Sequence, residues 1–237
     1  RRQSNRSVRV PAYDVPMKTL AFDVYGTLID PLGIAVALQE YVDDDAAAFA
    51  AAWRAKQLEY LFRRGLGRKY QPFSVCTRQA LDFTCLSTGV DIPVVSRDAL
   101  MARYLELPAF EEAARALESL NASGWRCFAF SNGEPQDVDT LLDNAGLLPY
   151  LKGVVSVHET RSYKPDPSVY GFFLENTGAL LGQTWLVSGN PFDVLGALEV
   201  GWKAAWVRRD SSLVFDPWGL DPTLVTDSLS GLVRALE

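Results

Sequence analysis

Four groups of polar residues in this chain each follow a short apolar run, and their side chains are of the kinds that carry out displacement chemistry. The groups are Asp23 with Thr27, Ser131 with Asn132, Lys164 with Asp166, and Ser188 with Asn190 and Asp193. A carboxylate next to an ammonium group stays ionised and can act as a nucleophile, because a nearby cation favours the charged form of an acid. Asp23 and Lys164 are the candidates for such a pair.

The apolar runs are continuous rather than alternating, and segments with helical spacing separate them, which predicts a parallel sheet covered on both faces. The carboxyl ends of parallel strands lie along one edge of the sheet, where open α/β folds bind ligands. A single Ser, Asn or Asp in such a place is more often a helix cap. Four strand ends in a row favour a common site.

The sequence therefore predicts an α/β fold: a Rossmann-like parallel sheet flanked by helices, with a helical cap inserted after the first strand. The expected strands cover 18–24, 125–130, 153–157, 184–188, 203–207 and 223–226. The expected helices cover 45–62, 74–87 and 96–106 in the cap, and 110–120, 135–145, 167–177, 193–200 and 229–236 elsewhere.

We expect a core domain formed by 17–30 and 107–237, and a cap domain formed by 31–106. The first sixteen residues, 1–16, are rich in Arg and Ser and poor in acids, which could indicate an organelle transit peptide. An upstream extension or a cloning remnant is the favoured interpretation, because Met17 stands where a start codon would make sense.

Composition narrows the possible partners and compartments. The 237 residues include 23 basic and 29 acidic side chains, giving a net charge of −6 that argues against nucleic acid as the main partner. No apolar run reaches the roughly 18 residues of a membrane span, so no membrane partner is expected. Three cysteines without a CxxC spacing favour reduced thiols in a cytoplasmic protein over a disulfide framework or a zinc site.

The motifs as a set resemble a known superfamily. Asp-Val-Tyr-Gly-Thr at 23–27, Ser-Asn-Gly at 131–133, Tyr-Lys-Pro-Asp at 163–166 and Ser-Gly-Asn-Pro-Phe-Asp at 188–193 look like the four motifs of the haloacid dehalogenases. With Trp-Arg-Ala-Lys-Gln-Leu-Glu-Tyr at 53–60, the chain is most similar to the (S)-2-haloacid dehalogenases. This resemblance implies hydrolysis of short (S)-2-haloalkanoic acids to (R)-2-hydroxy acids, through an ester on the carboxylate of Asp23. It also implies a homodimer, and no metal or other cofactor.

The resemblance further implies a role for each matching side chain. Arg54, Asn132 and Phe192 match the halide pocket, while Ser131 and backbone N–H groups near Val24 would hold the substrate carboxylate. Asp193, with Asn190 and Lys164, would activate the water that hydrolyses the ester. Thr27, Ser188 and Tyr170 would hold the nucleophile and the lysine in place, with Tyr170 also counted as substrate-binding. Tyr25, Leu58 and Phe73 would face the alkyl group of the substrate, although Phe73 could equally be a core residue.

Two other functions remain open at this point. A Mg²⁺-dependent phosphatase of the same superfamily would use a second aspartate where this chain has Tyr25, and a tyrosine with a pKa of about 10 is a poor general acid near neutral pH. Asn190 leaves Asp193 as the main carboxylate for Mg²⁺, which prefers several oxygen ligands. A non-catalytic binding member is the third possibility, against which the Asp23–Lys164 pair argues. Ala55 and Glu134 depart from the usual pattern, and we expect them to affect cap closure, pocket size or substrate range.

Overall fold

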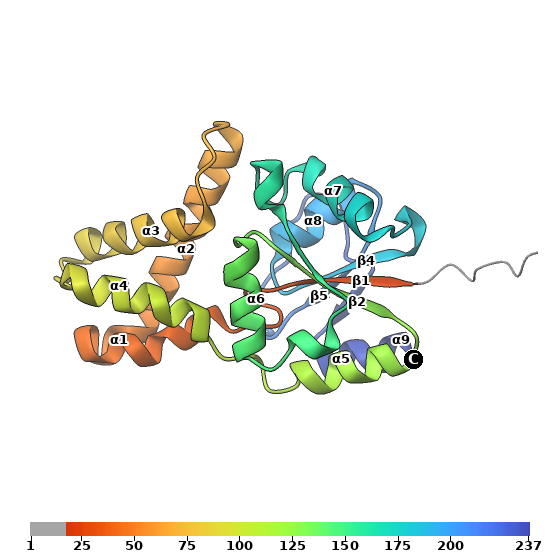
Figure 1. Cartoon of the computed structure of the whole chain (residues 1–237), viewed down its shortest axis with the longest axis horizontal. Coiled ribbons are helices and arrows are strands. Elements are labelled where there is room, and N and C mark those ends of the chain that lie inside the picture. The colour runs from red at the N-terminus through yellow and green to blue at the C-terminus, as the bar shows by residue number, and fades with distance from the viewer. Residues whose placement is uncertain (1–17) are drawn as a thin grey trace, which may run out of the picture.

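A six-stranded parallel sheet forms the centre of the molecule (Figure 1). The computed structural model describes residues 18–237, so the expectation for 1–16 falls outside the described residues. The strands are β1 (Thr19–Asp23), β2 (Arg126–Ser131), β3 (Val154–Ser156), β4 (Thr184–Ser188), β5 (Lys203–Val207) and β6 (Leu224–Thr226). Their order in the sheet is β3-β2-β1-β4-β5-β6.

Strand β1 lies in the middle of the sheet and pairs with β2 on one side and β4 on the other. All five of its residues are buried, as expected for a strand covered on both faces. The chain winds outward through β2 and β3 on one side, and through β4, β5 and β6 on the other. The direction in which successive strands are added to the sheet therefore reverses between β1 and β4. Open α/β sheets bind their ligands in the crevice at such a reversal.

Helices cover both faces of the sheet, with α5 and α9 on one face and α7 and α8 on the other (Figure 1). The helices outside the insertion are α5 (Ala113–Ala122), α6 (Pro135–Asn144), α7 (Pro167–Thr177), α8 (Pro191–Glu199) and α9 (Leu229–Leu236). Local sequence sets their ends. For example, Asp166 accepts a hydrogen bond from the N–H of Ser168 at 2.9 Å at the start of α7, and Gly178 ends that helix with φ at 64°.

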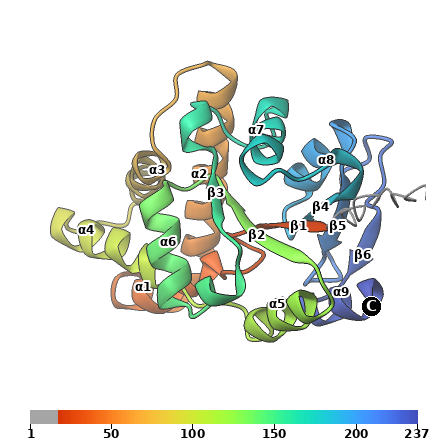
Figure 2. The same cartoon turned by 45° about the vertical axis from the view of Figure 1, so that its right-hand side comes forward.

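Residues 31–106 form a helical insertion between β1 and α5. Its helices are α1 (Ala35–Val42), α2 (Ala46–Leu66), α3 (Phe73–Thr88) and α4 (Val94–Arg103). In both views the insertion lies beyond the carboxyl ends of the strands (Figure 1, Figure 2). Its two connections to the core run side by side: the N–H of Asp30 donates to the carbonyl of Pro108, and that of Phe110 to the carbonyl of Leu28, both at 2.9 Å.

The predicted fold class is confirmed, with small differences in the elements. Helix α1 was not expected as a separate element. Helix α5 begins at Ala113 rather than Phe110, because Phe110 belongs to the connection that pairs with Leu28. Cys76, Cys85 and Cys127 are buried and free. Among residues 18–237, every helix is too short or too polar to cross a bilayer.

Candidate active site

Lys164 lies between two carboxylates at the carboxyl edge of the sheet. Its Nζ donates to Oδ1 of Asp23 at 3.0 Å and to Oδ2 of Asp193 at 2.8 Å. Lys164 and Asp193 are almost fully buried, and Asp23 is 8% exposed. The three residues come from the ends of β1, the loop before α7 and the first turn of α8, so the parallel sheet brings them together as the sequence predicts.

The second oxygen of Asp23 accepts three hydrogen bonds. Oδ2 accepts from Nδ2 of Asn190 at 2.7 Å, from Oγ1 of Thr27 at 3.0 Å and from Oγ of Ser188 at 3.4 Å. Thr27 in turn accepts from the N–H of Gly189 at 2.8 Å. These donors fix the direction of the carboxylate, and a carboxylate nucleophile must be aimed in this way.

The pKa values in this cluster follow from burial and from the opposing charges. Burial alone would lower the pKa of Lys164, but the charges of Asp193 and Asp23 outweigh it and raise that pKa above its ordinary value. Burial raises the pKa of Asp193 to about 6, and Lys164 opposes this rise. At neutral pH the cluster therefore holds an ammonium group between two carboxylates. Tyr170 donates its hydroxyl to Oδ1 of Asp193 at 2.8 Å and fixes that side chain.

The helical insertion contributes a guanidinium group to the cavity that Asp23 also lines. Arg54, on α2, donates to the carbonyl of Tyr25 at 3.3 Å and to Oε1 of Gln57 at 2.6 Å. Gln57 is fully buried and is fixed by a short hydrogen bond to Thr77 on α3. The ring of Tyr25 stacks on Phe73, with centroids 5.0 Å apart.

A cavity of about 10 Å³ lies between the insertion and the sheet edge. It is lined by Asp23, Tyr25, Arg54, Leu58, Leu61, Phe73, Asn132, Asn190 and Phe192. This volume holds about one water molecule. One carboxylate, one guanidinium group and two amides therefore line the cavity together with aliphatic and aromatic side chains.

Comparison with known proteins identifies the family. A family model described as haloacid dehalogenase-like hydrolase matches residues 17–201. The chain belongs to this family. It is 34% identical to an (S)-2-haloacid dehalogenase of Pseudomonas sp. (strain YL), over 93% of this chain and 95% of that protein. It is 31% identical to haloacetate dehalogenase H-2 of Moraxella sp. (strain B), over 93% of this chain and 98% of that protein.

A solved structure agrees with these relatives. The L-2-haloacid dehalogenase of Xanthobacter autotrophicus with covalently bound chloropropionic acid has a TM-score of 0.87, with 28% identity over 93% of this chain and 98% of that one. Within the haloacid dehalogenase-like hydrolases, the chain therefore falls in the L-2-haloacid dehalogenase group, and the predicted resemblance is confirmed.

Most of the residues singled out from the sequence either line the cavity or touch a residue that does. Thr27, Lys164, Ser188 and Asn190 contact Asp23 directly, while Asp193 and Tyr170 lie behind Lys164. Val24 and Ser131 do not line the cavity. The side chain of Val24 is fully buried, and Oγ of Ser131 accepts from the N–H of Gly133 at 3.1 Å. Their expected part in binding the substrate carboxylate stays a prediction.

Two further residues belong to this site and were not predicted from the sequence. Leu61 lines the cavity, and its place on α2, one turn after Leu58, could have indicated this. Gln57 follows Arg54 by three residues on the same helix and orients its guanidinium group. No pattern in the sequence distinguishes Gln57 from an ordinary polar helix residue.

The donor set around Asp23 is a poor match to the Mg²⁺ site of a phosphatase. The ammonium group of Lys164 already occupies the space between the two carboxylates, and the Asn190 side chain presents its NH₂ group, not its oxygen, to Asp23. Mg²⁺ requires oxygen ligands around it. Burial also raises the pKa of Tyr25 far above its ordinary value, so Tyr25 cannot replace the acid/base aspartate of phosphatases.

Proposed function

We propose that this chain hydrolyses short (S)-2-haloalkanoic acids to (R)-2-hydroxy acids, with Asp23 as the nucleophile. The observation that carries the proposal is the position of the Asp23 carboxylate, which lines the same cavity as Arg54 while Lys164 and Asn190 fix it by hydrogen bonds. The names of the relatives support the same reaction.

In the first step an oxygen of Asp23 attacks C2 of the substrate, and the carbon–halogen bond breaks. The electron pair of that bond leaves with the halide, and C2 is inverted as the ester forms. Arg54, Asn132 and Phe192 line the cavity and form the proposed halide site. A guanidinium group at that place stabilises the negative charge that develops on the halogen.

In the second step water attacks the carbonyl carbon of the ester, which releases the hydroxy acid and restores Asp23. The water must lose a proton, and Asp193 is the proposed acceptor. Its Oδ2 lies 2.8 Å from Nζ of Lys164, which in turn contacts Asp23. A pKa of about 6 suits a base that works near neutral pH.

Substrate entry requires movement of the insertion, because the cavity of about 10 Å³ is too small for any haloacid. We propose that residues 31–106 act as a cap domain that opens from a core domain formed by 17–30 and 107–237. The apolar side chains of Leu58, Leu61 and Phe73 then close over the alkyl group.

The first test is halide release from (S)- and (R)-2-chloropropionate, measured separately and with a chelator present. We expect release from the (S) form alone, and a loss of roughly 10³-fold or more in Asp23→Asn. Asp139→Asn, an exposed aspartate on α6, is the matched control and should retain full activity. Chelator-sensitive release of phosphate from phosphoesters, with no halide release, would instead support the phosphatase alternative.

We also propose a homodimer located in the cytoplasm. The three free and buried cysteines are compatible with a reducing compartment. Light scattering coupled to size-exclusion chromatography will show whether the mass is that of one chain or two.

A further inference from the structure

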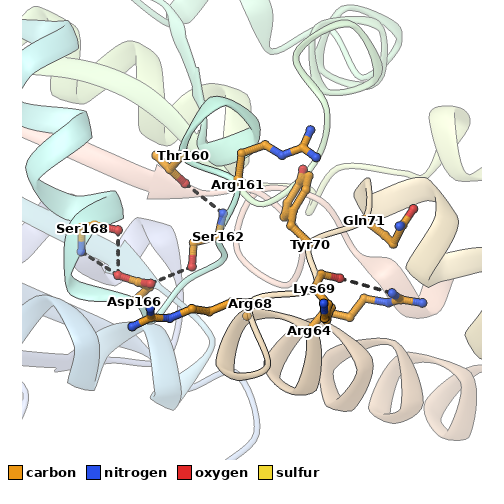
Figure 3. Close-up of a pocket in the computed structure, with 11 residues that line it drawn as sticks. Arg64, Arg68, Lys69, Tyr70, Gln71, Thr160, Arg161, Ser162, Asp166 and Ser168 are labelled. Atoms are coloured by element: carbon orange, nitrogen blue, oxygen red, sulfur yellow. Dashed lines mark hydrogen bonds between the residues drawn. The ribbon is translucent and has the colours of Figure 1, made fainter.

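A second and much larger pocket lies between the insertion and the core, outside the site described above (Figure 3). Its volume is about 750 Å³. One wall is the segment 64–71, which joins α2 to α3, and the other is the segment 160–168, which leads into α7. None of the residues that line it lines the cavity next to Asp23.

The pocket is strongly basic although the protein as a whole is acidic. Its lining contains four cations, Arg64, Arg68, Lys69 and Arg161, and one carboxylate, that of Asp166. Within the part of the chain that the structure describes, none of these four cations forms an ion pair. The uncompensated charge of this pocket contrasts with the net charge of −6 for the whole chain.

The single carboxylate is already engaged by its own neighbours. Asp166 accepts hydrogen bonds from Oγ of Ser162 at 2.7 Å and from the N–H and Oγ of Ser168 at 2.9 and 2.7 Å. These bonds, with the nearby charge of Arg68, outweigh burial and lower the pKa of Asp166. One carboxylate cannot balance four cations, so the pocket keeps a surplus of positive charge.

Two of the four cations belong to residues with unusual backbone conformations. Arg68 and Arg161 have φ values of 51° and 54°, in the left-handed region that side chains other than glycine rarely adopt. The guanidinium carbon of Arg161 lies 4.8 Å from the centre of the Tyr70 ring, whereas Arg68 extends toward Asp166 on the other side (Figure 3). The two guanidinium groups therefore come from opposite walls of the pocket.

Arg64 completes the basic wall of the insertion. It donates to the carbonyl of Lys69 at 3.3 Å and to Oε1 of Gln79 at 2.5 Å, so it is fixed by neutral groups and its charge stays free. Guanidinium groups bind carboxylate and phosphoryl oxygens through paired hydrogen bonds, and they are weakly hydrated enough to do so in competition with water.

We propose that this pocket binds a small polyvalent anion that carries two or more phosphoryl or carboxylate groups. A volume of about 750 Å³ is in the range of metabolite sites and is far larger than a haloacid needs. The spread of Arg64, Arg68, Lys69 and Arg161 over two walls favours a ligand with separated anionic groups. Such a ligand joins segment 64–71 of the insertion to segment 160–168 of the core, and so favours the closed arrangement of the two parts.

The test is isothermal titration of the full chain with inorganic pyrophosphate and, separately, with citrate, at constant ionic strength. We expect saturable binding of at least one probe at one site per chain and a rise in Tm with its concentration. Arg68→Gln/Arg161→Gln should weaken binding tenfold or more. Arg115→Gln/Arg234→Gln removes the same charge from exposed positions on α5 and α9, away from the pocket, and should change binding less than twofold.

Equal weakening in the two double variants would overturn the proposal, since binding would then follow net charge alone. Unchanged binding in Arg68→Gln/Arg161→Gln would also overturn it. So would the absence of saturable binding by the unmodified chain. The proposal does not depend on dehalogenation. Arg68→Gln/Arg161→Gln should release halide from (S)-2-chloropropionate at the rate of the unmodified chain when no probe is present. Hydrogen exchange should show protection of 64–71 and 160–168 when the bound probe is added, and protection elsewhere would contradict the assigned place.

Discussion

Ser74 donates both its hydroxyl and its backbone N–H to the carboxylate of Glu134. The distances are 2.6 Å from Oγ to Oε1 and 3.2 Å from N to Oε2. Ser74 lies in the first turn of α3 in the insertion, and Glu134 follows β2 in the core. A negative charge at a helix N-terminus is favourable, so this contact stabilises closure of the insertion over the sheet edge. It also fixes the neighbouring Phe73, which lines the cavity.

We therefore predict that Glu134→Ala raises KM for (S)-2-chloropropionate about tenfold, which corresponds to the roughly 1.5 kcal/mol of a charged hydrogen bond. Ser74→Ala should have a smaller effect, and the double variant should be no worse than Glu134→Ala alone. Steady-state kinetics will measure the effects, with Glu118→Ala on the exposed face of α5 as the control. Effects that simply add would show that the two side chains do not act together.

Gln57 is predicted to be a positioning residue for Arg54. Gln57→Met keeps the approximate shape but removes the acceptor for the guanidinium group, which lies 2.6 Å from Oε1. We expect halide release to fall about tenfold, the consequence of losing one charged hydrogen bond of roughly 1.5 kcal/mol. In an Arg54→Gln background the same change should have no further effect on activity. A further loss in that background would mean that Gln57 acts by another route.

Two glycines within helices allow a matched pair of Gly→Ala substitutions whose effects on the free energy of unfolding should have opposite signs. A Cβ at Gly196 in α8 would lie 2.4 Å from the hydroxyl of Tyr170 and 2.6 Å from Cβ of Pro165, whereas a Cβ at Gly171 in α7 meets nothing within 4 Å. Gly196→Ala should lower the free energy of unfolding by about 1–3 kcal/mol through overpacking. Gly171→Ala should raise it by about 0.5–1 kcal/mol, because alanine favours helix. Chemical denaturation of both variants checks the opposite signs.

The pKa of Asp193 predicts opposite effects of pH on activity and on stability. Activity should fall as the pH drops below about 6, because Asp193 gains a proton and no longer serves as the base. Burial raises this pKa above its unfolded value of 3.8, so the native state binds more protons between these values, and the contribution of Asp193 to stability grows as the pH falls. The difference in unfolding free energy between the unmodified chain and Asp193→Asn, measured from pH 7 to pH 4, isolates this contribution. A difference that is constant with pH would contradict it.

The sheet and the cluster around Asp23 could be predicted from the sequence because both depend on local patterns. Each of the polar residues Asp23, Lys164 and Asp193 follows an apolar strand, and parallel strands bring such ends to one edge whatever the details of packing. Contacts that depend on how helices meet could not be predicted. Gln57 contacts Thr77 only once α2 and α3 have packed together, and Ser74 contacts Glu134 only once the insertion lies over the sheet edge.

The roles of individual side chains were the least predictable part. Ser131 has the residue type expected of a ligand for the substrate carboxylate, and its hydroxyl oxygen accepts a hydrogen bond from the backbone of its own turn. This bond leaves the hydroxyl hydrogen for another acceptor, so the predicted role stays a prediction. The path of the next two residues sets this contact, and spacing within the sequence does not determine that path.

The paired connections at Asp30–Pro108 and Leu28–Phe110 make the insertion a replaceable cassette. Because both ends of the 31–106 segment leave the core at neighbouring points, a different helical unit with closely spaced ends can take its place without altering the order of the strands. The nucleophile and its ammonium partner belong to the retained scaffold, while Arg54, Leu58 and Phe73 belong to the cassette. Exchange of this one segment therefore alters the halide site and the apolar wall together, while the nucleophile and its ammonium partner stay in place.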